Sequence, residues 1–188
     1  MDLLRCYRKR MKPFDITPTE RIVFEAVTAE HENEAVEIYR DNKALMALLG
    51  PQSVEASGRS FALKEELPPG GKAKNNRHFL LYSRNEQLIG LLDYYCGYPR
   101  ADAIYIGSLF LKQDCQGKGY GRETALHLEE LAIQKGFHWA YCGVGLKNWG
   151  ALRFWTNCGY TMVTKVSGDG EYSPNGFACI ELAKMLVL

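Results

Sequence analysis

The sequence predicts an α/β fold in which a central mixed sheet carries helices within a single domain. Segments with strand and helix patterns alternate in the order β-α-α-β-β-β-α-β-α-β-β, which is typical of a sheet covered by helices. The length of 188 residues matches one domain with one large core. No internal repeat, low-complexity tract or linker interrupts the pattern. These observations favour one domain over residues 21–188.

The first twenty residues are predicted to be a flexible basic tail. They carry Arg5, Arg8, Lys9, Arg10 and Lys12 within a dozen positions. Such a cluster can anchor a chain to an anionic surface or form an amphipathic targeting helix. A frayed terminus has the same appearance, and this is the interpretation we adopt for residues 1–20.

The first third of the domain reads as one strand and two helices. Residues 21–27 alternate and contain β-branched side chains, which is typical of a strand. Apolar residues recur at helical spacing between Glu30 and Leu49, and Gly50-Pro51 ends that segment. A second helix is predicted from Ser53 to Leu67, where Pro68-Pro69-Gly70-Gly71 closes it.

The rest of the chain adds six strands and two helices. The strands are predicted at His78–Ser83, Gln87–Cys96, Ala103–Leu111, His138–Val144, Tyr160–Val166 and Phe177–Met185. A helix is expected from about Gly119 to Lys135, because its apolar positions form one stripe and Gly136 can end it. Another is expected from Trp149 to Cys158, with Gly159 after it.

Composition narrows the class of protein. A net charge of +1 argues against a nucleic-acid binder. No run approaches the roughly 18 apolar residues of a membrane span. The six cysteines include no CxxC pair, a pattern of reduced thiols in a cytoplasmic protein. We also expect no metal and no covalent acyl-enzyme, since no zinc motif and no Ser or Cys nucleophile beside a histidine is visible in the sequence. A homodimer is compatible with these data.

A glycine-rich turn, Gln116-Gly117-Lys118-Gly119-Tyr120-Gly121, lies between a predicted strand and a predicted helix. Glycines let backbone N–H groups approach a ligand closely, and the helix directs its positive dipole end at the same spot. The turn therefore predicts a pyrophosphate site, with Lys118 and Arg122 as additional cations. A connector that only turns the corner between the two elements would have the same glycine content.

These residues resemble the GCN5-related N-acetyltransferase (GNAT) superfamily. Gln116–Gly121 matches its Gln/Arg-x-x-Gly-x-Gly/Ala signature, and Val144–Ala151 resembles its second signature, an Asn and an Ala that open a helix. Phe154-Trp155 and Cys158-Gly159-Tyr160 are similar to its closing aromatic element, so the match spans Ile104 to Tyr160. The resemblance implies a mostly antiparallel sheet of about seven strands with four helices, whose parallel strands four and five splay apart.

The resemblance also implies a binding site for acetyl-CoA. The backbone of Leu109, Phe110 and Leu111 would pair with the pantetheine arm as an added strand would. Asn148 would contact the pantetheine or the acetyl end, although it also suits a helix N-cap, and both roles are compatible. The expected cofactor-binding residues are Leu109, Phe110, Leu111, Gln116, Gly117, Lys118, Gly119, Tyr120, Gly121, Arg122, Asn148 and Trp155.

Acetyl transfer to an amine needs a base, an oxyanion donor and an acid for the leaving thiolate. The N–H of Leu111 is the expected oxyanion donor. Trp155 stands where the family often has its acidic Tyr, and Tyr105 stands where some members have a basic Glu, so neither role transfers directly. Tyr105, through water, and Asp93, on an otherwise apolar strand, are the candidate replacements.

The leading prediction is thus a cytoplasmic enzyme, an acetyl-CoA-dependent N-acetyltransferase that acts on a primary amine of a small molecule or a protein. Its partners would be acetyl-CoA and the amine acceptor, with no nucleic acid and no membrane. The alternative is a non-catalytic acetyl-CoA-binding sensor or structural module. The identity of the acceptor is not encoded in any motif of the sequence.

Overall fold

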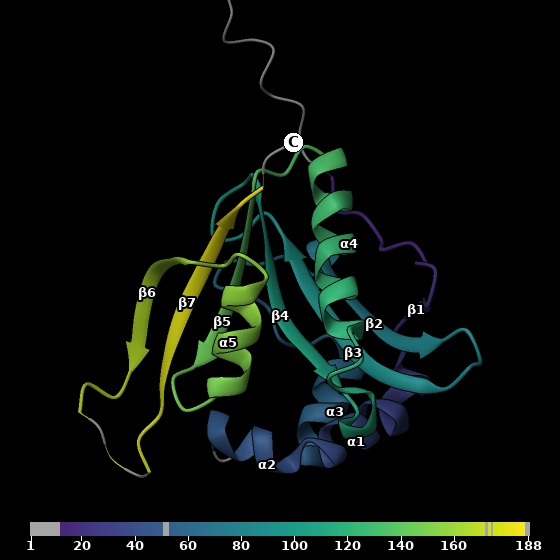
Figure 1. The fold of residues 1–188 in the computed structure, drawn as a ribbon, viewed down its shortest axis with the longest axis horizontal. Coiled ribbons are helices and arrows are strands. Elements are labelled where there is room, and N and C mark those ends of the chain that lie inside the picture. Colours follow the sequence, from purple (N-terminus) through teal and green to yellow (C-terminus); the bar gives the residue numbers. More distant parts are fainter. Residues whose placement is uncertain (1–11, 51–52, 172, 174, 187–188) are drawn as a thin grey trace, which may run out of the picture.

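The computed structural model describes residues 12–50, 53–171, 173 and 175–186 (Figure 1). Its strands are β1 (Ile22–Ala26), β2 (Asn76–Ser83), β3 (Leu88–Cys96), β4 (Ala103–Leu111), β5 (Trp139–Gly145), β6 (Met162–Gly168) and β7 (Ala178–Met185). Its α-helices are α1 (Glu32–Asp41), α2 (Lys43–Met46), α3 (Val54–Leu63), α4 (Tyr120–Gln134) and α5 (Trp149–Asn157). The mixed α/β fold that the sequence predicts is confirmed.

The strands form one seven-stranded sheet in the order β1-β2-β3-β4-β5-β7-β6. Every neighbouring pair is antiparallel except the central pair, β4 and β5. That parallel pairing runs only from Ala103 with Trp139 to Ile106 with Cys142. Residues 107–111 of β4 therefore have no partner on β5, and the two strands splay apart as the family resemblance implies.

The helices cover the two faces of the sheet unequally. Helices α4 and α5 lie in front of the sheet in Figure 1, over a core that includes Ile104, Ile106 and Phe137. Helices α1 and α3 pack on the opposite face, mainly over β2 and β3, through Tyr39 and Phe61. The two helices approach closely because residue 58 is glycine, and a Cβ there would lie 2.4 Å from Cγ2 of Val36.

Two predicted helices are shorter than expected. The helix expected from Glu30 to Leu49 is divided at Asn42 into α1 and α2, so the described part has five α-helices instead of four. Asn42 leaves the helical conformation (φ −101°, ψ 20°), and its Nδ2 donates to the carbonyl of Ile38 (2.9 Å). The helix expected to reach Leu67 ends at Leu63, because Lys64 adopts the left-handed conformation with φ 57°.

The domain also begins earlier than residue 21. Phe14 and Ile16 are 6% and 4% exposed and belong to the main core. The hydroxyl of Tyr94 donates to the carbonyl of Phe14 (2.7 Å). These contacts tie residues 14–16 to the core, and we therefore propose that the domain starts before Phe14, ahead of the boundary predicted at residue 20. Most of the predicted basic cluster, residues 5–10, lies outside the described residues.

Candidate active site

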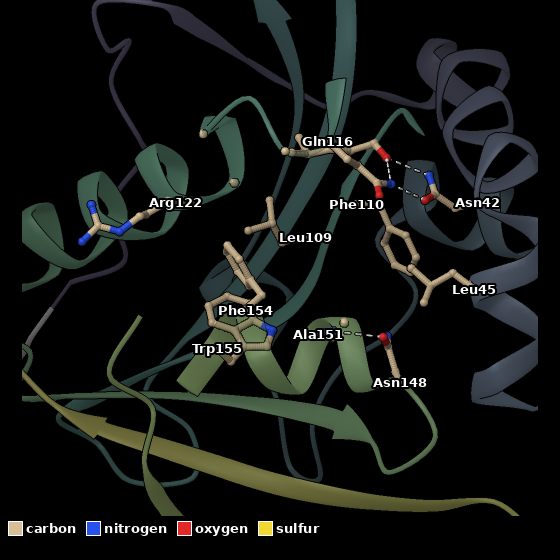
Figure 2. Close-up of a pocket in the computed structure, with 15 residues that line it drawn as sticks. Asn42, Leu45, Leu109, Phe110, Gln116, Arg122, Asn148, Ala151, Phe154 and Trp155 are labelled. Atoms are coloured by element: carbon tan, nitrogen blue, oxygen red, sulfur yellow. Dashed lines mark hydrogen bonds between the residues drawn. The ribbon is translucent and has the colours of Figure 1, made fainter. Parts of the chain in front are cut away.

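A cavity of about 560 Å³ opens where β4 and β5 diverge (Figure 2). The strand end at Leu109–Leu111, the turn at Gln116–Gly121 and helix α5 form most of its wall. The lining residues are Asn42, Leu45, Leu109, Phe110, Leu111, Gln116, Gly117, Gly119, Gly121, Arg122, Asn148, Gly150, Ala151, Phe154 and Trp155. The structure therefore brings together nearly all the residues that the sequence predicts for cofactor binding. Lys118 and Tyr120, which belong to the same turn, are not among them.

The turn has the backbone geometry of an anion site. Gly117 and Gly119 have φ of 71° and 87°, a conformation that favours glycine, and Gly119 is the N-cap of α4. The first bond of the helix runs from the N–H of Glu123 to the carbonyl of Gly119 (3.0 Å). The N–H groups of residues 120–122 therefore precede any helical acceptor and are available, with the helix dipole, to a phosphate.

Gln116 has a role that the motif alone does not reveal. Its N–H donates to the carbonyl of Gln113 (3.2 Å), so this group is already engaged. Its Nε2 donates to Oδ1 of Asn42 (3.2 Å) and to the carbonyl of Leu111 (3.0 Å), which also accepts from Nδ2 of Asn42 (3.0 Å). The signature side chain and Asn42 together fix the end of β4 against the turn (Figure 2).

The free edge of β4 presents alternate backbone groups to the cavity. The N–H of Lys112 donates to the carbonyl of Ile89 (2.9 Å), so the even-numbered residues of this stretch bond to β3. Because an antiparallel ladder alternates, the backbone groups of Leu109 and Leu111 point the other way, into the gap that β5 leaves. A pantetheine arm could therefore bond to Leu109 as an added strand would.

Asn148 and Trp155 close the far wall. Oδ1 of Asn148 accepts from the N–H of Ala151 (3.0 Å), which makes it the N-cap of α5 and leaves its amide on the cavity surface. Trp155 is 6% exposed and packs edge-on against Phe154 and Tyr160. An indole is no source of protons near neutral pH, so Trp155, which the resemblance places where an acidic Tyr is often found, is a packing residue here.

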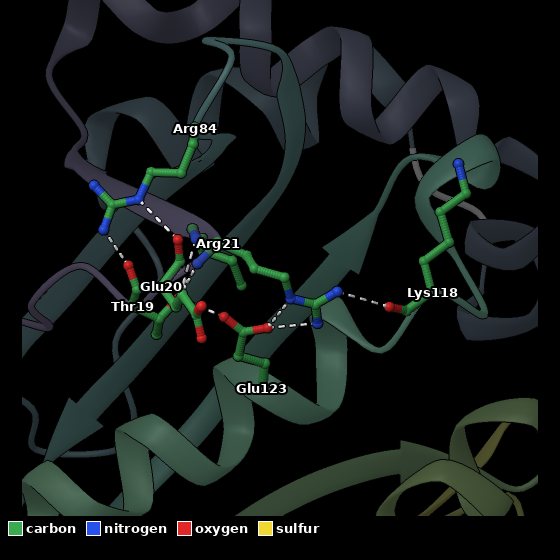
Figure 3. A network of polar contacts seen from close by, with 7 residues as sticks. Thr19, Glu20, Arg21, Arg84, Lys118 and Glu123 are labelled. Carbon is green, nitrogen blue, oxygen red and sulfur yellow. Dashed lines mark hydrogen bonds and ion pairs between the residues drawn. The ribbon is translucent and has the colours of Figure 1, made fainter.

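A polar network, which the sequence does not reveal, braces the outside of the turn (Figure 3). Nη1 of Arg21 donates to the carbonyl of Lys118 (3.2 Å), and its Nε donates to Glu123 in the first turn of α4 (2.6 Å). The guanidinium also lies 4.8 Å from the ring centre of Tyr120. Arg21 thus joins the start of β1 to both sides of the predicted pyrophosphate turn.

A second cavity, of about 260 Å³, adjoins the unpaired part of β4 on the α3 side of the sheet. Its lining residues are Glu66, Leu67, Pro68, Pro69, Asn76, Asp93, Tyr95, Tyr98, Tyr105 and Gly107. Asp93 and Tyr105, the two side chains predicted to take part in proton transfer, thus lie in the same cavity. Tyr105 clusters with Ala103 and Tyr141 on the face of β4 opposite Ile104 and Ile106, and the two cavities share no lining residue.

Asp93 combines burial with a poised carboxyl group. Burial raises its pKa from 3.8 to about 7, against the effect of hydrogen bonding to Ser108. The nearby charge of Glu66 raises it further. The carboxyl group lies directly against β4 because residue 107 is glycine: a Cβ there would be 2.1 Å from Oδ1 of Asp93. A group that titrates near neutral pH in a cavity is suited to general base catalysis.

Tyr105 is less suited to that role. Burial raises the pKa of its hydroxyl above the ordinary value, and the charge of Glu181 adds to the effect. The ring of Tyr98 packs edge-on against it, with centroids 5.4 Å apart. Tyr105 therefore remains protonated and can donate a hydrogen bond or relay a proton through water, while Asp93 is the better proton acceptor.

The described residues contain no group of three or more His, Cys, Asp or Glu side chains placed to hold a metal ion. No helix in the described part of the chain is both long and apolar enough to cross a membrane.

The first cavity is an open groove between splayed parallel strands. Together with the fold, this groove defines an α/β protein that can hold an anionic ligand at a helix N-terminus. The sequence model of the acetyltransferase (GNAT) family matches residues 37–160. The chain therefore belongs to this family, whose members transfer acetyl groups from acetyl-CoA. No curated protein sequence matches the chain.

Solved structures with this fold include several acetyltransferases. One from Thermus thermophilus has 22% identity and a TM-score of 0.66, covering 92% of this chain and 100% of that one. A probable GNAT acetyltransferase from Chromobacterium violaceum has 14% identity and a TM-score of 0.74, covering 98% and 93%. A ribosomal-protein alpha-N-acetyltransferase in complex with coenzyme A has 16% identity and a TM-score of 0.67, covering 92% and 98%. At these identities the likeness establishes the fold alone.

Proposed function

We propose that this chain is an N-acetyltransferase that moves an acetyl group from acetyl-CoA directly to a primary amine while both are bound. The observation that carries the proposal is the position of the two cavities. One contains the anion-binding turn, the other contains Asp93, and the unpaired end of β4 borders both. An acetyl group held along β4 from one side would meet an amine that enters from the other.

The groove suits acetyl-CoA in shape and in chemistry. The N–H groups of residues 117–122 would hold the pyrophosphate, and Arg122 adds a positive charge at the cavity wall. Leu109 and Leu111 would bond to the pantetheine, with Asn148 on the opposite side. Bound acetyl-CoA supplies the activated acetyl group and a thiolate leaving group.

Asp93 would act as the general base. A free alkylamine has a pKa of about 10.4 and must lose a proton before it can attack. The ionised carboxylate of Asp93 would accept that proton, directly or through one water. Because Asp93 pairs with Ser108 across the strands, the N–H of Leu109 lies nearest among the groups that face the gap. We therefore favour Leu109 over Leu111, two residues or about 7 Å farther along, as the donor to the acetyl oxygen.

One observation favours a second function, a module that binds acetyl-CoA without transferring it. Trp155 occupies the position of the family's acidic Tyr, so the groove has no corresponding proton donor there. The thiolate has a conjugate-acid pKa of about 8.5 and can leave without a dedicated acid, although more slowly. The two functions differ in whether any amine promotes release of free thiol.

The first experiment measures acetyl-CoA binding by calorimetry and thiol release across a panel of amines. Gly121→Val should abolish binding, because a Cβ at this position already lies 3.3 Å from the ring of Phe154 and would fill the groove. Gly170→Val is the matched control, since a Cβ there meets no atom of the described residues within 4 Å. Unchanged affinity of Gly121→Val for acetyl-CoA would show that the turn only connects β4 to α4 and does not bind the ligand. Binding by the wild type without thiol release on any amine would show a binding module.

A further inference from the structure

The second cavity has a chemical character that restricts the acceptor. Its wall carries two carboxyl groups, Asp93 and Glu66, and three tyrosines, Tyr95, Tyr98 and Tyr105. Among the described residues that line it, none is lysine, arginine or histidine. Its volume of about 260 Å³ suits a small molecule or one extended side chain. The cavity is therefore both aromatic and acidic.

We infer that the acceptor is a small alkylamine or arylalkylamine that carries no carboxylate of its own. This inference rests on the proposed transferase function and concerns the acceptor side of the same site. Tyrosine rings attract ammonium groups and offer apolar surface to a hydrocarbon chain. The two carboxyl groups add charge attraction for a cation, and they repel an acceptor that brings an acid beside its amine.

The acidic wall is held in place by buried polar groups. Nδ2 of Asn76 donates to the backbone carbonyl of Glu66 (3.0 Å), and it also meets Nε2 of His78 (2.9 Å). Nδ1 of His78 lies 2.8 Å from the carbonyl of Phe61. Asn76 and His78 are 6% and 4% exposed. The segment after α3 that carries Glu66 is therefore anchored to β2.

This anchor does not offset the negative charge of the cavity. The carbonyl of Phe61 can only accept, so Nδ1 of His78 donates and Nε2 accepts from Asn76. Burial lowers the pKa of His78 to about 4, so the ring is neutral near pH 7. The hydroxyl of Tyr95 accepts from the N–H of Lys72 (2.7 Å), which holds this ring in the wall as well.

The test compares acceptors that differ by one carboxylate. The pairs are tyramine with tyrosine and cadaverine with lysine, and tyrosinamide serves as a neutral analogue of tyrosine. Thiol release from acetyl-CoA gives kcat/KM for each. We expect the amine without a carboxylate to react at least about tenfold faster in each pair. The reason is that the carboxylates of Asp93 and Glu66 repel the carboxylate of the acceptor. Tyrosinamide should recover most of the loss, which would separate charge from size.

Glu66→Gln tests the wall itself, with Glu65→Gln as the matched control because Glu65 is adjacent and does not line the cavity. Glu66→Gln should reduce the preference for tyramine over tyrosine severalfold, at an unchanged KM for acetyl-CoA, whereas Glu65→Gln should leave the preference intact. Turnover of tyrosine or lysine as fast as its partner would overturn the inference while leaving the transferase function standing. Faster acetylation of the amine of a C-terminally amidated peptide than of every small amine would also overturn the inference and leave the transferase function standing. Absence of thiol release with every amine would refute the transferase function itself, and this inference with it.

Discussion

Replacement of Asp93 by asparagine should stabilise the protein at alkaline pH and inactivate it. In the folded protein the pKa of Asp93 is raised from 3.8 to about 7, primarily by burial. Between these values the folded state retains a proton that the unfolded state has lost, so the free energy of unfolding decreases as the pH rises. The loss of unfolding free energy caused by Asp93 is small below about pH 4 and reaches its full value above about pH 7.

The size of this effect follows from the shift. Each pKa unit corresponds to about 1.4 kcal/mol, so a shift of about three units costs about 4 kcal/mol at pH 8.5 and less than half of that at pH 5. Asp93→Asn carries no titrating group, and its gain in stability over the wild type should therefore increase by about 2–3 kcal/mol from pH 5 to pH 8.5. Urea denaturation of both proteins at each pH measures this difference.

Asp102→Asn is the control of opposite sign. Burial raises the pKa of Asp102, but hydrogen bonds from Arg100 and the backbone outweigh it and hold the pKa below its usual value. Its carboxylate therefore contributes stability above the unfolded pKa, and the substitution should lose stability as the pH rises. A gain for Asp93→Asn that is independent of pH would refute the assigned burial.

The same substitution tests the base. Asp93→Asn should lower kcat/KM by about 10²–10⁴-fold, the usual contribution of a general base. It should leave acetyl-CoA affinity unchanged, because Asp93 does not line the first cavity. The wild-type kcat/KM should rise through an apparent pKa near 7. Retention of wild-type activity in the variant would remove Asp93 from the mechanism.

Two further predictions concern polar contacts outside the cavities. Arg21→Met should raise the KM for acetyl-CoA about tenfold, because the carbonyl of Lys118 and the carboxylate of Glu123 lose their shared donor. Turnover of acetyl-pantetheine, which lacks the pyrophosphate, should be unaffected, and an equal loss with both donors would indicate general destabilisation. Lys184→Met should lower the free energy of unfolding by about 3 kcal/mol, because Glu129 is 4% exposed and Nζ of Lys184 lies 2.5 Å from it. Glu129→Gln in the Lys184→Met background should restore most of that loss in the same urea denaturation assay.

Most of the secondary structure was predictable because it depends on local patterns. The strands alternate or carry β-branched runs, and the glycines at 119, 136 and 159, which have positive φ, mark helix boundaries. The break at Asn42 could not be predicted in this way, because apolar residues continue at helical spacing on both sides of it. At the break Asn42 makes a tertiary hydrogen bond to Leu111, 69 residues away, which no local pattern can reveal.

The glycine-rich turn and the residues that line the cavity beside it were predictable from a contiguous motif, whereas the groups that brace the turn were not. Arg21 lies 97 residues before Lys118, and no periodicity links the two. Phe14 and Ile16 sit in a polar segment without a strand or helix pattern, so their burial in the core left no signal.

Asp93 lies beside the gap between β4 and β5 because of one irregularity in β4. Tyr94 pairs with Ile106, but Asp93 pairs with Ser108, so Gly107 is an extra residue in the strand. A bulge of this kind reverses the alternation beyond it. Ile106 faces α4, and Ser108, which would otherwise share that face, hydrogen-bonds to Asp93 on the opposite one.

The same bulge determines which backbone groups face the gap. Without the extra residue, the register of residues 108–111 would slip by one, and the N–H groups of Ser108 and Phe110 would replace those of Leu109 and Leu111. The proposed base on β3 is thus compatible with the proposed oxyanion donor on β4 only in this register. Tyr105, which lies before the bulge, occupies the position of the family's Glu, yet the carboxylate that adjoins the gap comes from the neighbouring strand. The proposed base can therefore come from a different strand than the family's Glu while the cavity that it lines still adjoins β4.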